Sequence, residues 1–105
     1  MSESNAAVTI GIGQFRGATR NFVYRALAGE TFTVMRRGRP AVELRGTHNR
    51  RCEYALKISL AAARTRASKF FDRVATGDII AIEHCGETIA VLHPCVNDQA
   101  AQAKP

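Results

Sequence analysis

Arginine is the residue type in this sequence that most clearly indicates a binding function. The 105 residues include 15 basic and 9 acidic side chains, for a net charge of +6, and most of the basic residues are arginine. A guanidinium group binds phosphate oxygens in bidentate fashion and displaces the counterions condensed on a nucleic acid. The composition therefore favours an anionic partner, with nucleic acid as the first candidate.

Four arginines stand where a helix is expected to begin. Arg16 and Arg64 follow short apolar segments and precede amphipathic stretches, and Arg20 and Arg66 lie close behind them. The free N–H groups and the positive dipole end of a helix N-terminus favour bound phosphate. The competing interpretation is that each is a solvated surface arginine. The recurrence of the first two at a fixed spacing, described below, argues against it.

A phosphate-binding loop and a zinc site are two further possibilities that the residue spacing does not support. The glycine-rich segment 11–17 precedes an expected helix but lacks the Lys and Ser/Thr of a phosphate-binding loop. A zinc site could be drawn from His84, Cys85, His93 and Cys95. Their spacing matches no common site, and neighbours on a strand point to opposite faces. No nucleophile, base and orienting group stand at a recognisable spacing, so we expect no enzyme, no metal and no cofactor.

Cysteine usage and hydropathy bear on the compartment. Cys52, Cys85 and Cys95 are an odd number at irregular spacing without a C-x-x-C motif, which is typical of reduced thiols. No apolar run approaches the roughly 18 residues of a membrane span, and the first residues show no signal-peptide pattern. We expect a cytoplasmic protein that does not interact with a membrane.

Two parts of the chain repeat each other with an offset of 48 residues. Identities in one ungapped register are Ile10 with Ile58, Arg16 with Arg64, Phe22 with Phe70, Arg25 with Arg73, Gly29 with Gly77, Gly38 with Gly86 and Leu44 with Leu92. Conservative apolar matches lie between them, among them Val34 with Ile82. Repetition at a fixed period indicates that one structural unit occurs twice.

Each copy shows the same order of expected elements. In the first copy, alternating apolar residues at 8–12 predict a strand, and an apolar stripe over 15–27 predicts one helix that ends at Gly29. Residues 31–44 then predict a hairpin that turns at Gly38. The second copy repeats this plan, so the expected topology of each unit is β-α-β-β. The aromatic residues of both helices are expected in the core.

A unit of about 40 residues buries too little surface to be stable alone, so the two copies are expected to pack together. The sequence therefore predicts an α+β protein in which two β-α-β-β repeats form an intramolecular pseudo-dimer. The expected boundaries are 1–45 for the first repeat, 46–55 for a linker, 56–94 for the second repeat and 95–105 for a short polar tail.

Both copies carry residues of a known pattern. The segment 63–78, which reads Ala-Arg-Thr-Arg-Ala-Ser-Lys-Phe-Phe-Asp-Arg-Val-Ala-Thr-Gly-Asp, and the two expected strands after it resemble the N-terminal domain of the Phd/YefM family of antitoxins. In the first copy, the segment 32–42 with its Arg-Arg-Gly turn is similar to the hairpin of that family. The resemblance covers most of both copies.

The resemblance implies a fold, a function and site residues. Members of the family bind operator DNA as dimers, repress their own promoter and neutralise a toxin through a C-terminal extension. Carried over, the basic residue at the helix start falls on Arg16 and Arg64, and the basic residue that ends the middle strand falls on Arg36, which Arg37 follows in the Arg-Arg-Gly turn. The candidate DNA-binding residues are thus Arg16, Arg20, Arg36, Arg37, Arg64 and Arg66.

The second copy and the tail depart from the family pattern. His84 and Cys85 replace the two hairpin arginines, and the first copy carries a net charge of +5 against +1 for the second. The first copy is therefore expected to make more of the phosphate contacts, on an imperfectly palindromic operator. The tail 95–105 has no apolar stripe that could lie in a toxin groove.

The expected function is that of a repressor and antitoxin of a type II toxin–antitoxin system, which controls its own operon through operator DNA. A small cognate toxin and further homo-oligomerisation remain open as partners. The alternative is a protein-binding module of the antitoxin fold, which neutralises or scaffolds a partner without specific DNA binding.

Overall fold

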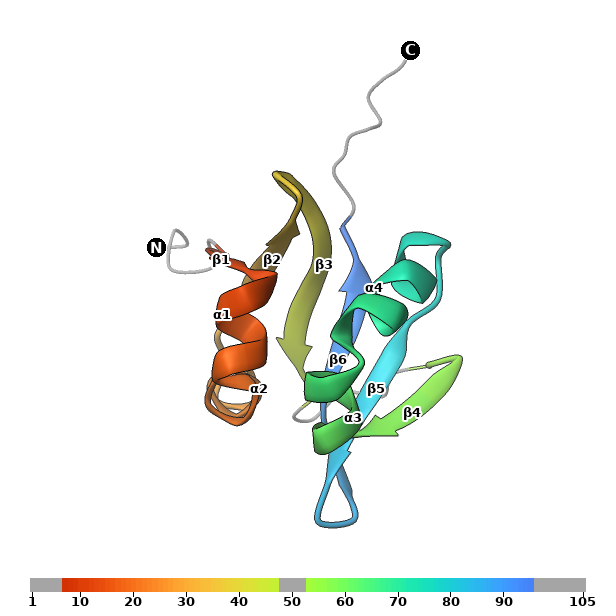
Figure 1. Ribbon diagram of the computed structural model, residues 1–105. Helices are drawn as coiled ribbons and strands as arrows, with labels where there is room; N and C mark the ends of the chain where they lie inside the picture. Colours follow the sequence, from red (N-terminus) through yellow and green to blue (C-terminus); the bar gives the residue numbers. More distant parts are fainter. Residues whose placement is uncertain (1–6, 48–52, 96–105) are drawn as a thin grey trace.

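Six strands and four short helices follow one another in the computed structural model, which describes residues 7–47 and 53–95 (Figure 1). The strands are β1 (Val8–Gly11), β2 (Phe32–Arg36), β3 (Arg39–Gly46), β4 (Leu56–Ser59), β5 (Ile80–His84) and β6 (Glu87–Pro94). The helices are α1 (Ile12–Gly17), α2 (Thr19–Leu27), α3 (Leu60–Thr65) and α4 (Ala67–Ala75). The predicted α+β class is confirmed. The middle of the expected linker and the tail after residue 95 lie outside the described residues.

All six strands form one mixed sheet in the order β1-β2-β3-β6-β5-β4. The outer pairs β1–β2 and β4–β5 are parallel, and the hairpins β2–β3 and β5–β6 are antiparallel. At the centre β3 and β6 run antiparallel, with Leu44 opposite Leu92. The β2–β3 and β5–β6 turns therefore point to opposite ends of the sheet (Figure 1).

The two hairpin turns share an uncommon backbone conformation. Arg37 and Cys85 have φ angles of 56° and 55°, and the glycines that follow, Gly38 and Gly86, also have positive φ. Two successive residues with positive φ suit a tight hairpin, because their twist matches that of the flanking strands. Each hairpin therefore carries a non-glycine side chain at its tip.

The helices lie on one face of the sheet, where they form a continuous core with it (Figure 1). The largest fully buried side chains are Phe15, Phe32, Phe71, Leu44, Ile80, Ile82, Leu92, Val23, Val34, Val42 and Val74. The rings of Phe15 and Phe71 lie 5.7 Å apart, and those of Phe22 and Phe32 lie 5.1 Å apart. The expected core positions in the helices, Phe22, Val23, Phe70 and Phe71, are indeed buried.

The prediction of one continuous helix per unit is wrong. Each splits in two at a residue with non-helical dihedral angles: Ala18 has φ −145° and ψ 43°, and Arg66 has φ −123° and ψ 32°. Both helices also begin earlier than expected, because Ile12 and Leu60 start α1 and α3 rather than end the strands before them. The first break follows Gly17, a residue that disfavours helix interiors, whereas Thr65 and Arg66 give no comparable signal at the second break.

Helix α2 lies directly on β3 at Gly46, the last residue of that strand. A Cβ atom at Gly46 would overlap the carbonyl group of Ala26 in α2. The residue 48 positions later is Pro94, the last residue of β6, so the side chain there is a full ring. Close approach of a helix backbone to the strand end is thus possible at β3 because Gly46 has no side chain.

Candidate nucleic-acid interface

Arg16 and Arg64 lie on opposite sides of one surface hollow, where α1 packs against α3. The hollow has a volume of about 480 Å³ and is lined by Gly13, Arg16, Gly17, Arg64 and Thr65. Two arginines from different helices therefore lie beside the same hollow.

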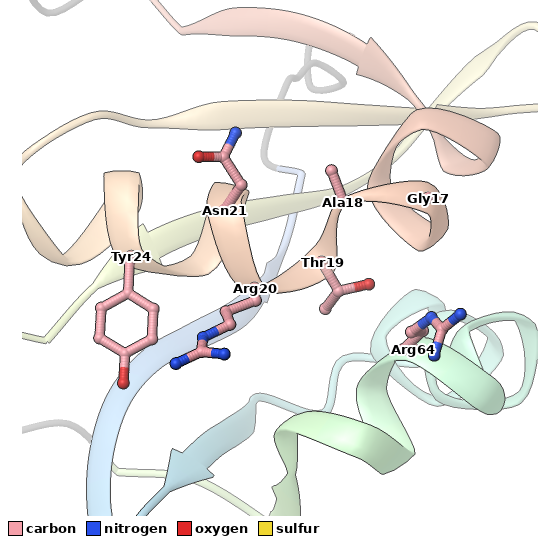
Figure 2. Close-up of a pocket in the computed structure, with 7 residues that line it drawn as sticks. All are labelled: Gly17, Ala18, Thr19, Arg20, Asn21, Tyr24 and Arg64. Carbon is pink, nitrogen blue, oxygen red and sulfur yellow. The ribbon is translucent and has the colours of Figure 1, made fainter.

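Two adjoining hollows extend this surface toward α2. The larger, of about 740 Å³, is lined by Gly17, Ala18, Thr19, Arg20, Asn21, Tyr24 and Arg64 (Figure 2). The smaller, of about 270 Å³, is lined by Thr19, Arg20, Leu60, Ala61, Arg64 and His84. Arg64 borders all three hollows, so they form one surface, here termed the α1–α3 basic surface, whose charged members are Arg16, Arg20 and Arg64.

No carboxylate balances this charge within residues 7–47 and 53–95. Neither Asp nor Glu lines any of the three hollows, and none of the three arginines has an ion pair among the described residues. Like charges held near one another repel unless an anion lies between them. The arrangement is therefore suited to a ligand that brings several negative charges, such as a phosphodiester chain.

Short local contacts hold the backbone that positions these arginines. In the first half, the Gly11 N–H donates to Gln14 Oε1 (2.9 Å), and the buried Thr19 hydroxyl donates to the Phe15 carbonyl (2.7 Å) across the break. In the second half, Ser59 Oγ accepts the N–H of Ala62 (3.0 Å) and so caps α3. The arginine side chains extend from this fixed backbone into solvent.

The position of the arginines on the helices differs from the prediction. Arg16 and Arg64 lie in the last turns of α1 and α3 and not at helix starts, because those helices begin at Ile12 and Leu60. Arg20 is instead the second residue of α2, and Arg66 immediately precedes α4. The positive end of a helix dipole, which favours a bound phosphate, therefore lies beside Arg20 and Arg66 and not beside Arg16 and Arg64.

The six predicted arginines do not form one group. Arg66 is exposed at the break between α3 and α4 and lines none of the three hollows. Arg36 and Arg37 lie at the β2–β3 turn, where they line a separate hollow. The Arg36 guanidinium donates to Asp72 Oδ1 (2.6 Å) and to the Ser68 carbonyl (3.0 Å).

Arg25 and Arg73, which match in the repeat, lie outside the basic surface. Arg25 makes two hydrogen bonds to Glu30 (2.7 and 2.8 Å), and Arg73 pairs with Asp78 (2.9 Å). The hydrogen bonds from Arg25 lower the pKa of Glu30 below its ordinary value. Each arginine lies in the last turn of its helix and therefore neutralises the acidic residue that follows that helix.

Asn21, Tyr24 and His84 border the basic surface and did not figure among the predicted site residues. The Tyr24 hydroxyl lies 2.6 Å from His84 Nδ1 and joins α2 to the second hairpin. The repeat relates this contact to the Arg36–Asp72 pair, because a shift of 48 residues places Tyr24 on Asp72 and Arg36 on His84. Both members of the Arg36–Asp72 pair thus change together.

Comparison with protein-family models, curated proteins and solved structures found no match to this chain. In the part of the chain that the structure describes, no three His, Cys, Asp or Glu side chains are grouped closely enough to hold a metal ion. Over the same residues, no helix is long and apolar enough to cross a membrane.

Proposed function

We propose that the chain is a DNA-binding repressor and antitoxin component of the Phd/YefM type, which controls its own operon. The observation that carries this proposal is the α1–α3 basic surface, where Arg16, Arg20 and Arg64 line adjoining hollows that no carboxylate of the described residues lines. Arg66, at the start of α4, lies outside these hollows and is proposed as a further phosphate contact. Operator DNA is the anion that matches both this surface and the resemblance of the sequence.

The proposed fold is a pseudo-dimer of two repeats, with boundaries at 1–45 and 56–94. Every element of the second half has the length of its counterpart and begins 48 residues later. The central register supports a two-fold relation, because Val42 pairs with Pro94 and Gly46 with Ala90, on either side of the Leu44–Leu92 pair. Exchange of the two halves leaves these pairings unchanged.

The contacts between the halves support the same relation. Exchange of the halves converts the Arg36–Asp72 pair into the Tyr24–His84 pair, and both contacts are 2.6 Å long. The contacts that end the helices, Arg25–Glu30 and Arg73–Asp78, are exchanged in the same way. One contact geometry thus occurs at both ends with different chemistry.

The two-fold relation predicts that Tyr24→Asp and His84→Arg rescue each other. The double variant recreates at the second hairpin the pair that joins Arg36 to Asp72, whereas each single variant leaves an unmatched charge. Because these side chains are exposed, we expect a coupling energy of about 0.5 kcal/mol. Urea denaturation of the wild type, both single variants and the double variant measures it. Strictly additive effects would contradict the two-fold relation.

The function is tested by fluorescence titration of the full chain against DNA from upstream of its own coding sequence. We expect binding that resists a scrambled competitor, and an affinity that falls with about the fourth power of salt concentration if four arginines neutralise phosphates. A scrambled duplex of the same length and base composition is the control. Equal affinity for both duplexes would exclude operator recognition.

Binding of a partner protein is the second candidate function. Arg36 and Arg37 border a hollow away from the α1–α3 basic surface, so part of the basic charge is available for another ligand. Toxin neutralisation is the corresponding activity in the proposed family.

A further inference from the structure

A second basic hollow lies beside the β2–β3 turn. It has a volume of about 450 Å³ and is lined by Arg36, Arg37, Arg39, Pro40, Ala41, Phe71, Val74, Ala75, Pro94 and Cys95. Its arginines come from the turn, and its apolar residues come from α4 and the strand ends. Phe71 and Val74 are fully buried at its base, whereas Pro40 and Ala75 are exposed.

At the corresponding place in the other half, the helix lies too close to the strand for a side chain to fit between them. There α2 lies on β3 at Gly46, where even a Cβ atom would overlap the Ala26 carbonyl. On the side of the hollow, the position of Gly46 is taken by Pro94, whose ring lines the hollow together with Ala75 at the end of α4. Two differences in packing between the halves thus accompany the open space: Pro94 stands in place of Gly46 on the strand, and Ala75 stands in place of Leu27 on the helix.

The charge around the hollow is also specific to this half. The guanidinium groups of Arg37 and Arg39 are exposed and have no hydrogen bond or ion pair among the described residues. At the second hairpin, Cys85 and Glu87 occupy the matching positions. Arg36 is held by Asp72 and the Ser68 carbonyl, so it forms a fixed wall between the turn and α4.

We propose that this hollow binds an acidic segment of a partner protein. Carboxylates of the segment pair with Arg37 and Arg39, and a small apolar side chain enters between Pro40, Ala75 and Pro94. Complementary charge favours an acidic over a basic partner, and the apolar lining favours a polypeptide side chain over a phosphodiester backbone. The proposal does not depend on DNA binding, because it uses none of Arg16, Arg20 and Arg64.

The test uses the full chain and a fluorescein-labelled peptide of alternating glutamate and leucine, with a lysine–leucine peptide as the charge control. We expect Arg37→Glu with Arg39→Glu to weaken binding of the acidic peptide at least about tenfold. Arg16→Glu with Arg64→Glu makes the same change of net charge elsewhere, and should weaken binding less than about threefold. Equal losses in both double variants would overturn the proposal.

A filling variant separates docking from general attraction between opposite charges. Ala75→Arg places a long cationic side chain in the hollow and raises the net charge of the protein. Docking predicts a loss of peptide affinity of about tenfold, because the apolar space is occupied. Tighter binding would show that charge alone attracts the peptide and would refute a docking site.

The same variants distinguish this proposal from operator binding. Arg37→Glu with Arg39→Glu should leave the affinity for upstream DNA within about threefold of the wild type, since long-range electrostatics are screened at physiological salt. Loss of DNA affinity with unchanged peptide affinity would assign the hollow to the DNA interface instead. Failure of all DNA binding, with the peptide results as expected, would leave the docking site intact.

Discussion

Replacement of Arg16 and Arg64 together by alanine is expected to weaken operator binding about 100-fold without change in the free energy of unfolding. Both side chains border the same hollow between α1 and α3, and neither makes an ion pair among the described residues. A charge-assisted hydrogen bond contributes about 1.5 kcal/mol, so two lost phosphate contacts together cost about 3 kcal/mol. Since 1.4 kcal/mol corresponds to a factor of ten, this is about 100-fold.

The salt dependence supplies a second measure of the same effect. Each lost phosphate contact lowers the exponent of salt dependence by about one, so the double variant should lose about two. Fluorescence anisotropy with the upstream duplex at several salt concentrations measures both quantities, and urea denaturation checks the fold. The two readouts must agree if the arginines act on phosphates.

Arg45→Ala with Lys57→Ala is the matched control, because it removes the same two charges from another face. Arg45 follows the buried Leu44 and Lys57 precedes the buried Ile58, so both side chains point away from the face that the helices cover. Each makes an ion pair on that face, with Glu43 and Glu83 respectively. An equal loss of affinity in this control would mean that only net charge matters, and the assignment of Arg16 and Arg64 would fail.

The hydrophobic pattern and the turn residues predicted most of the fold. Alternation at Phe32 and Val34 placed these residues in the core, and Gly29 and Gly77 have the positive φ angles expected of residues that end helices. The apolar stripe runs through the break of each helix and so did not show it, although Gly17 before Ala18 disfavours a continuous helix in the first copy. The alternation also assigned Ile12 and Leu60 to the preceding strands, although they begin α1 and α3, and this error placed Arg16 and Arg64 in the wrong helical turn.

Of the candidate site, the sequence predicted a set of arginines but not which of them lie together. The repeat singled out Arg16 and Arg64, since a surface residue without a role need not recur. The separation of Arg36 and Arg37 from this pair depends on the packing of the two halves. The ion pair between Arg36 and Asp72 joins residues that lie 36 positions apart and in different halves. Local sequence patterns carry no information about such a contact.

Gly46→Ala is expected to destabilise the protein by about 3 kcal/mol, which lowers the melting temperature by about 12 °C for a domain of this size. The new methyl group would overlap the Ala26 carbonyl and the Leu27 backbone, so α2 has to move away from β3. A helix backbone cannot yield as a flexible side chain does, which places the cost at the upper end of the range for overpacking. Calorimetry and urea denaturation measure the change.

Gly13→Ala is the control, because it makes the same chemical change at an exposed position of α1. No atom lies within 4 Å of a Cβ built at Gly13, so alanine there should stabilise the protein by about 0.5 kcal/mol. Both substitutions restrict the unfolded chain equally, so a difference well beyond the helix propensity gained at Gly13 reports the native contact at Gly46. If Gly46→Ala were as stable as Gly13→Ala, α2 would not lie against β3. The contrast between the closed site at Gly46 and the open hollow at Pro94 would then lose its physical basis.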